Sequence, residues 1–195
     1  MKQPEEYTLH TDILVIGAGP AGLAAALAAA AGMRKRGLSR SVTVLDKSGA
    51  PGTHILSGCV IHRSALARLH PFVSSAPTFP AVSVSRDGIR FLFPRRSIYL
   101  PSRLLPVNLR HAGDVVISAG SLCRWLDAEC AAAGVDVLYG SPVSRIRRDD
   151  KEWVADIPEA GLDKNGARRA GYKPEGGCHI FCVNGKFHRG TRSPK

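Results

Sequence analysis

The feature that most constrains this chain is the segment of residues 11–22, TDILVIGAGPAG, in which an apolar run leads directly into a glycine-rich turn. The run from Ile13 to Ile16 predicts a short parallel strand that is buried on both faces. Pro20 suits the first turn of a helix, where its missing N–H costs nothing. The G-x-G-x-x-G spacing is typical of a loop that holds the pyrophosphate of a dinucleotide.

Each glycine of this turn has an expected task. Gly17 permits the tight turn, Gly19 lets the backbone approach the phosphates, and Gly22 allows the helix to pack closely on the strand. The anion would lie on N–H groups at the positive end of the helix dipole. Gly17, Gly19, Pro20 and Gly22 are predicted to hold the pyrophosphate, and Ala18 and Ala21 between them complete the predicted cofactor-binding turn.

An acidic residue after a second strand completes the predicted unit. The alanine-rich helix is expected to end at residues 34–36, RKR, because cations favour a helix C-terminus and Gly37 is a natural residue just beyond it. The next apolar run, Val42 to Leu45, predicts a strand that ends at Asp46. Asp46 lies 24 residues beyond Gly22. This is close to the spacing of about 20 expected for a carboxylate that accepts ribose hydroxyls.

The main alternative for this region is a membrane span. Residues 13–33 contain no charge, and about 20 apolar residues can cross a bilayer. However, three glycines and a proline stand near the start of the segment, and alanine, which dominates its later half, is only weakly favourable in hydrocarbon. We therefore favour the strand, turn and helix, whereas a span would require one uninterrupted helix.

Composition indicates a globular chain with one sizeable core. It has 195 residues, of which 44% are hydrophobic and 22% are charged. An odd number of cysteines without a C-x-x-C pair predicts neither a disulfide framework nor a zinc site. We interpret them as small buried apolar residues in a reducing compartment. The cysteines are Cys59, Cys123, Cys130, Cys178 and Cys182.

The basic excess is concentrated at the end of the chain. The net charge is +11, and residues 164–195 carry eight basic side chains and one acidic side chain. Such a positive charge is compatible with binding to nucleic acid or to an anionic membrane surface. Scattered glycines and prolines and the lack of apolar periodicity favour a solvated or disordered tail instead.

Further elements are expected along the rest of the chain. After a glycine-rich loop, residues 64–70 predict a short helix, and residues 82–85, 89–93 and 97–100 predict short antiparallel strands. A later helix is capped by Ser118 or Ser121 and ends at Gly134, with one apolar side formed by Leu122, Trp125, Leu126 and Cys130.

Three more strands complete this outline. Val135 to Leu138 predicts a third strand that joins the first two as a parallel neighbour. Residues 143–146 and 153–157 predict another strand pair.

Several blocks of the sequence resemble, in order and spacing, those of the electron transfer flavoprotein:ubiquinone oxidoreductase family. The similarity covers residues 11–173. The blocks are Asp46-Lys47, GTHILSGCV at 52–60, RSALARLHP at 63–71, VISAGSLCRWL at 116–126, AGVDVLYG at 133–140 and GLDKNG at 161–166.

The resemblance implies an α/β fold in which a Rossmann-like parallel sheet for FAD or NAD(P) carries inserted antiparallel β-strands. This chain would hold an incomplete domain of that fold. The resemblance also implies that Asp46 binds the ribose, that Lys47 beside it belongs to the cofactor-binding residues, and that His54, Ser57 and Gly58 lie along the flavin. Without it, His54 is interpreted as a structural loop histidine. The family's chemistry needs no protein nucleophile, so no catalytic residue is predicted.

By resemblance, FAD would accept electrons from reduced electron transfer flavoprotein, exchange them with a [4Fe-4S] cluster and reduce ubiquinone at a membrane surface. The implied location is the matrix side of the mitochondrial inner membrane in a eukaryote, or the inner membrane of a bacterium. Association with the membrane would be peripheral, and no specific nucleic acid is implied. Residues 1–10 show neither a secretory signal nor a transit peptide.

The chain also departs from the family. Family members run to several hundred residues, and this chain ends after about the first third. Cys178 and Cys182 cannot hold the cluster alone, because it takes four thiolates. We expect an N-terminal extension at 1–10, a partial FAD-binding domain at 11–173 and a divergent basic tail at 174–195. Such a fragment is expected to bind FAD weakly, if at all, and to be unable to pass electrons to quinone by itself.

Two other functions fit the residues. One is a related FAD-dependent reductase or monooxygenase, which would share the nucleotide motif. The other is a non-catalytic module whose basic tail binds nucleic acid or acidic lipid.

Overall fold

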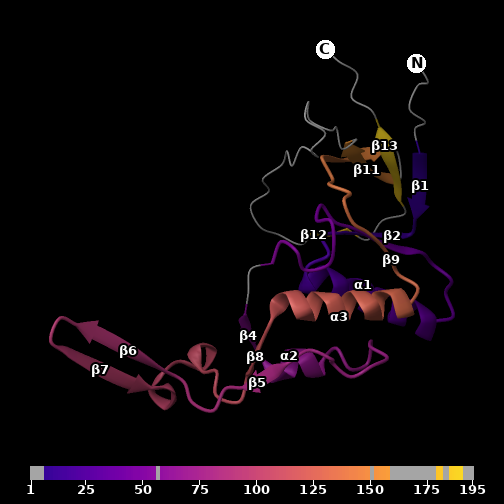
Figure 1. Cartoon of the computed structure of the whole chain (residues 1–195). Helices are drawn as coiled ribbons and strands as arrows, with labels where there is room; N and C mark the ends of the chain where they lie inside the picture. Colours follow the sequence, from indigo (N-terminus) through magenta and orange to yellow (C-terminus); the bar gives the residue numbers. More distant parts are fainter. Residues whose placement is uncertain (1–6, 56–57, 150–151, 159–178, 182–184, 191–195) are drawn as a thin grey trace.

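The chain forms a layered α/β structure, seen in a computed structural model that describes residues 7–55, 58–149, 152–158, 179–181 and 185–190 (Figure 1). The central sheet has the strand order β12-β2-β3-β9. Two helices, α1 (Pro20–Lys35) and α3 (Ala119–Ala132), lie side by side and pack together. The Rossmann-like sheet with inserted antiparallel strands is therefore confirmed.

The predicted nucleotide-binding unit is present. Strand β2 (Ile13–Ile16) pairs in parallel with β3 (Val42–Leu45), and α1 connects them. The membrane-span alternative is wrong for residues 13–33, because the chain leaves β2 at Gly17 and helix α1 begins only at Pro20. Within the part of the chain that the structure describes, no helix has the length and apolar character to cross a membrane.

A third parallel strand follows α3, as predicted. Strand β9 (Asp136–Leu138) pairs with β3 on the side opposite to β2, and it begins one residue later than the sequence indicates. On the other side of β2, β12 (His179–Phe181) pairs in the antiparallel direction.

Both long helices end at a glycine in the left-handed region. After α1, Gly37 has a φ of 67°, its N–H donates to the carbonyl of Arg34, and the N–H of Leu38 donates to the carbonyl of Met33. After α3, Gly134 has a φ of 75° and the same pair of bonds forms. This is the Schellman motif, which satisfies carbonyls that a helix end leaves unpaired.

The main core lies between the two helices and the sheets. The predicted apolar side of α3 is buried, and Leu23, Leu27 and Val44, from α1 and β3, are fully buried beside it. The buried residues of α3 in this cluster include Leu122, Cys123, Trp125, Leu126 and Cys130. A smaller cluster of Leu14, Leu45, Ala155 and Ile157 connects β2 and β3 to β11 (Glu152–Pro158).

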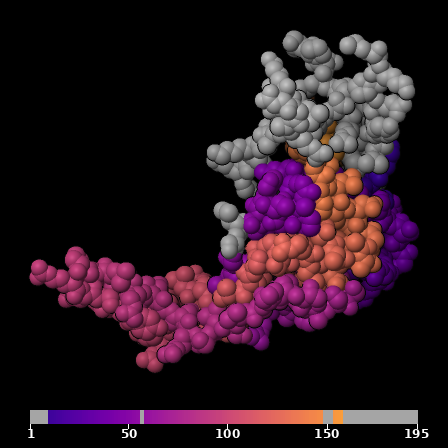
Figure 2. Space-filling view, viewed as in Figure 1, coloured from indigo at the N-terminus to yellow at the C-terminus, as the bar shows by residue number. Residues whose placement is uncertain are grey.

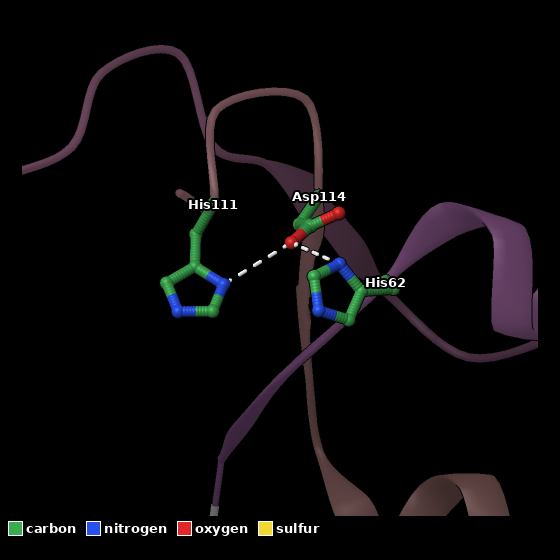
Figure 3. Close-up of side chains that lie close together, drawn as sticks. All are labelled: His62, His111 and Asp114. Carbon is green, nitrogen blue, oxygen red and sulfur yellow. Dashed lines mark hydrogen bonds and ion pairs between the residues drawn. The ribbon is translucent and has the colours of Figure 1, made fainter. Parts of the chain in front are cut away.

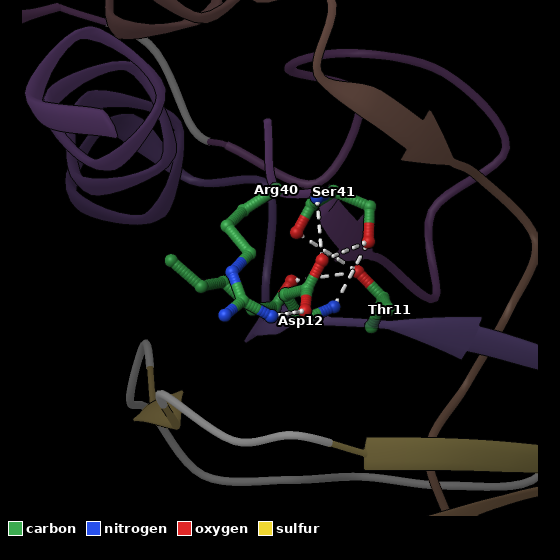
Figure 4. A network of polar contacts seen from close by, with 5 residues as sticks. Thr11, Asp12, Arg40 and Ser41 are labelled. Atoms are coloured by element: carbon green, nitrogen blue, oxygen red, sulfur yellow. Dashed lines mark hydrogen bonds and ion pairs between the residues drawn. The ribbon is translucent and has the colours of Figure 1, made fainter. Parts of the chain in front are cut away.

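A polar network fixes the starts of β2 and β3 (Figure 4). The carboxylate of Asp12 accepts from the backbone N–H of Ser41 at 2.9 Å and pairs with the guanidinium of Arg40 at 2.8 Å. The hydroxyl of Thr43 donates to the buried hydroxyl of Thr11 at 3.0 Å. These bonds set the register of the two strands before they reach the glycine turn.

The remaining strands form smaller sheets. Strand β8 (Val115–Ile117) lies between β4 (Cys59–Ile61) and β5 (Ala81–Ser83), both antiparallel to it. Strands β6 (Gly88–Phe93) and β7 (Arg96–Pro101) form a hairpin that projects from the body (Figure 2). The short helices are α2 (Arg63–Ala67), η1 (Ser102–Leu104) and η2 (Val107–Leu109).

A fourth sheet contains strands from the two ends of the chain. Its order is β1-β13-β11-β10, with β1 at Tyr7–Thr11, β10 at Arg145–Asp149 and β13 at Gly185–Gly190. The β10–β11 pair was predicted. Strands β12 and β13 fall within residues 174–195, where a disordered tail was expected, while residues 159–178 lie outside the described part. The domain boundaries at 10/11 and 173/174 stay predictions.

The left-handed helix end can be tested by replacing Gly37 with alanine. An added Cβ at Gly37 meets no atom within 4 Å, so any loss of stability comes from the backbone. Gly37→Ala is expected to lower the free energy of unfolding by about 1–2 kcal/mol, measured by urea denaturation. The matched control is Gly32→Ala inside α1, also in open space, which is expected to raise stability by up to about 1 kcal/mol. Equal stability of the two variants would contradict this account of the helix end.

Candidate functional site

The turn after β2 has the geometry that its glycines predict. Gly17 has a φ of 102°, in the region that favours glycine, and its N–H donates to the carbonyl of Leu45 at 2.7 Å. This bond continues the β2–β3 pairing by one residue and turns the chain toward α1. A side chain at this position would strain the turn whatever space surrounded it.

The start of α1 leaves room for a ligand. Gly19 is the N-cap residue, no side chain caps the helix, and its first turn carries no acidic residue. A Cβ built on Gly19 would meet no heavy atom within 4 Å. The first N–H groups of a helix lack partners inside the helix and lie at its positive end. The backbone at the start of α1 is therefore open to an anion. The sequence explains this, because the N-cap and the first helical residue are Gly19 and Pro20, neither of which has a side chain that can cap the helix.

The carboxylate of Asp46 lies directly against this turn. Its Oδ2 accepts from the backbone N–H of Ala18 at 2.6 Å, and its Oδ1 accepts from the N–H of Ser48 at 2.7 Å. An ionised carboxylate has about four acceptor positions, so each oxygen keeps capacity for a hydroxyl donor. The structure thus brings together Gly17, Ala18 and Asp46, as the spacing in the sequence predicted.

The site lies at the carboxyl ends of three parallel strands. The backbone N–H of Asp46 donates to the carbonyl of Leu138 at 3.0 Å, and the N–H of Ser141 donates to the carbonyl of Asp46 at 2.8 Å. The segment after β9 therefore holds Asp46 in place from the side opposite to the glycine turn. This edge is where ligands bind in open α/β sheets.

The loop after Asp46 packs against the start of α3 through two glycines. Gly52 has a φ of 74°, and a Cβ on it would lie 2.7 Å from the carbonyl oxygen of Gly120. Sequence reasoning did not identify this contact, although Gly120 lies within the S-x-G-x-x-x-R-W-L block of residues 118–126. The contact places the loop across the first turn of α3.

The remaining predicted residues are less constrained. Lys47, His54 and Gly58 are exposed, and Ser57 lies outside the described residues. In the structure, no hydrogen bond or ion pair links His54 to the glycine turn or to Asp46 among the described contacts. Their contacts with a cofactor, like those of residues 17–22 and Asp46, stay predictions.

The buried thiols are not suited to redox chemistry. Burial raises the pKa of Cys123 to about 11 and the pKa of Cys130 to about 12. Both thiols are free and protonated at neutral pH, whereas the thiolate is the reactive form. The prediction of buried apolar cysteines is confirmed for Cys123 and Cys130. Cys59 is free and half-buried, and Cys178 and Cys182 lie outside the described residues.

The β6–β7 hairpin forms a second surface of functional interest. All six residues of β6 are exposed, and Leu92 keeps 78% of its surface in solvent. Guanidinium groups lie over two of the aromatic rings, with Arg90 and Arg96 each 5.5 Å from the centroid of Tyr99 and Phe93 respectively. We call this hairpin, residues 88–101, the arm. Its exposed large apolar residues are Ile89, Phe91, Leu92, Phe93, Ile98 and Tyr99.

Comparison with known proteins identifies a family and several relatives. The sequence pattern of the family described as "Pyridine nucleotide-disulphide oxidoreductase" matches residues 11–156. The electron transfer flavoprotein-ubiquinone oxidoreductase of Pseudomonas aeruginosa is 31% identical over 175 residues, which are 88% of this chain and 32% of the relative. The mitochondrial enzyme of that name from Oryza sativa is 34% identical over 165 residues, 84% of this chain and 28% of the relative. The chain thus spans about a third of the length of these relatives.

Two solved structures share the α/β fold of this chain. A geranylgeranyl bacteriochlorophyll reductase-like protein from Thermoplasma acidophilum has a TM-score of 0.52 at 24% identity, covering 75% of this chain and 34% of its own. A flavoprotein/dehydrogenase from Cytophaga hutchinsonii has a TM-score of 0.50 at 23% identity, covering 81% of this chain and 36% of its own. At these identities the likeness concerns the fold alone.

The raised pKa values predict a labelling order for the cysteines. At pH 8 a maleimide is expected to modify Cys59 in the native chain, while Cys123 and Cys130 react only after denaturant is added. Mass spectrometry of the digested chain assigns each modified thiol. Modification of Cys130 at the rate of Cys59 without denaturant would contradict the packing of α3 on α1.

Proposed function

Because the chain belongs to the pyridine nucleotide-disulphide oxidoreductase family, we propose that it binds FAD and forms the flavin-binding part of an electron transfer flavoprotein-ubiquinone oxidoreductase. The observation that carries the proposal is the convergence of an uncapped helix start at Gly19 and the carboxylate of Asp46 at one edge of the sheet. The names of the relatives supply the donor and the acceptor of electrons.

The residues fit FAD in distinct ways. The backbone of residues 17–22 would hold the pyrophosphate, and Asp46 would accept hydroxyls of the ribose. His54, Ser57 and Gly58 would lie along the flavin, and Lys47 would contact the cofactor next to Asp46. When bound, FAD supplies the electron-carrying chemistry, while the protein binds, orients and electrostatically tunes it.

The two buried thiols favour flavin chemistry over disulphide exchange. Cys123 and Cys130 are buried with raised pKa values, so neither supplies a thiolate at neutral pH. A [4Fe-4S] cluster needs four thiolates, and no cysteine takes part in a metal-binding group among the described residues. We propose that this chain does not itself carry the cluster, binds FAD weakly by itself and does not reduce ubiquinone without further protein.

The exposed surface of the β6–β7 hairpin is suited to contact with a membrane. Its apolar side chains are interspersed with Arg90, Arg95 and Arg96, a mixture that suits insertion among apolar chains beside anionic headgroups. We propose peripheral association through this arm, at the matrix side of the mitochondrial inner membrane in a eukaryote or at the inner membrane of a bacterium. Ubiquinone is an apolar molecule that such a surface would adjoin.

The FAD site can be tested at Gly19. A Cβ there meets no protein atom, so Gly19→Ala is expected to cost less than about 1 kcal/mol of stability as a weaker helix cap. It should nevertheless weaken FAD binding by at least about tenfold, roughly 1.4 kcal/mol, because the methyl group fills the space the phosphates need. Titration calorimetry of the 195-residue chain measures the affinity.

The control is Gly32→Ala, in the last part of the same helix and also in open space. It should bind FAD as the parent does. Equal affinity of the two variants, or no FAD binding by the parent, would reject the proposed site.

The membrane surface can be tested at Leu92. Leu92→Asp should lower the fraction of chain that floats with ubiquinone-containing liposomes by several-fold, because a charge in the apolar interface is costly. Leu38→Asp, at a side chain that is 49% exposed after α1, serves as the control and should float as the parent does. Flotation that Leu92→Asp leaves intact but salt abolishes would instead indicate binding through the basic tail.

A further inference from the structure

Three side chains with metal-binding atoms meet where the hairpin joins the body (Figure 3). Nδ1 of His62 lies 2.9 Å from Oδ2 of Asp114, and Nδ1 of His111 lies 3.2 Å from the same oxygen. One ligand atom from each residue lies within 4.8 Å of the others. Among the described residues, His62, His111 and Asp114 form the one group of three or more potential metal ligands that lie close enough together to share an ion.

We propose that His62, His111 and Asp114 bind a divalent transition metal ion of the zinc class. Two imidazoles and one carboxylate are the protein ligands of many zinc sites, with water in the fourth position. Ligand atoms about 2.0–2.2 Å from a tetrahedral zinc ion lie roughly 3.3–3.5 Å apart. The nitrogen-to-oxygen distances therefore need to open by only a few tenths of an ångström.

Backbone hydrogen bonds of the fold bring these three residues together. In the antiparallel pair of β4 and β8, Ile61 stands opposite Val115, so the next residues, His62 and Asp114, face each other where the ladder ends. A turn then brings His111 back, because the N–H of Asp114 donates to the carbonyl of His111 at 3.0 Å. The three ligands are thus fixed by backbone pairing.

The surroundings hold this turn firmly. The N–H of Gly113 donates to the carbonyl of Val84 at 2.9 Å, and the N–H of Val84 donates to the carbonyl of Asp114 at 2.9 Å. The carboxylate of Asp87 accepts from the N–H of His111 at 2.6 Å. A preformed set of ligands loses little conformational freedom when it takes up an ion.

Access to the site is also adequate. The side chains of His62 and His111 are 57% and 40% exposed, whereas that of Asp114 is 11% exposed. An ion can therefore reach the ligands from solvent while the carboxylate stays partly shielded from water.

The consequence would be a link at the root of the arm. His62 lies between β4 and α2, whereas His111 and Asp114 lie on the segment by which the chain returns from the hairpin. The hydroxyl of Tyr99, on the hairpin, donates to the carbonyl of Asp87, which in turn contacts His111. A bound ion would join α2 to this segment and fix the direction of the arm. This inference does not depend on FAD binding.

The test is titration of the untagged 195-residue chain with Co²⁺, followed by its visible absorption, and competition with Zn²⁺. One equivalent is expected to bind. Asp114→Asn keeps the shape of the side chain but not its charge, and it should weaken binding by more than about tenfold, since loss of even an outer-shell partner costs about 10–100-fold. His111→Ala should do the same.

The control is His70→Ala, which removes an exposed histidine just after α2 and should leave the affinity unchanged. Circular dichroism checks that each variant is folded, and Zn²⁺ should raise the melting temperature of the parent and of His70→Ala but not of Asp114→Asn. Absence of binding by the folded parent, or equal binding by Asp114→Asn and the parent, would overturn the proposal and leave the cluster as two histidines that contact the Asp114 carboxylate.

Discussion

The hydrogen bond from the backbone N–H of Ala18 to the carboxylate of Asp46 joins the two halves of the candidate site, and the rest of the structure supports it. It forms only because β2 and β3 run in parallel with Ile16 beside Leu45. That register is fixed at the other end of the strands by the contacts of Asp12 with Ser41. Two polar connections therefore lie at the two ends of the apolar strand pair, and the one at Ala18 positions the start of α1 directly after it.

The sequence was sufficient for the parts of the fold that depend on local rules. Gly17 and Gly37 have positive φ angles where the turn and the helix end were expected, because only glycine adopts these angles freely. The apolar side of α3 followed from residue spacing, and Leu126 is 1% exposed as a result. The position of Asp46 beside the turn followed from its distance along the chain after Gly22.

Features that depend on pairing between distant segments could not be predicted in this way. Strand β5 was expected among neighbouring hairpin strands, but it pairs with β8, more than 30 residues later. The contact of Gly52 with Gly120 and the meeting of His62 with Asp114 arise from the same long-range arrangement. In each case the residues are ordinary in their local context, and only the register of two strands or the docking of a loop gives them a role.

The stacking of arginines on the hairpin has a consequence for solubility. Arg90 and Arg96 each lie 5.5 Å from an aromatic centroid, so their guanidinium groups cover ring faces that would otherwise meet water. A guanidinium is weakly hydrated and can move aside without leaving a buried charge, because its long stem lets the head remain in water. The two arginines thus cover Tyr99 and Phe93 only in part, since these side chains are 48% and 47% exposed, and the hairpin presents a mixed apolar and cationic surface to solvent.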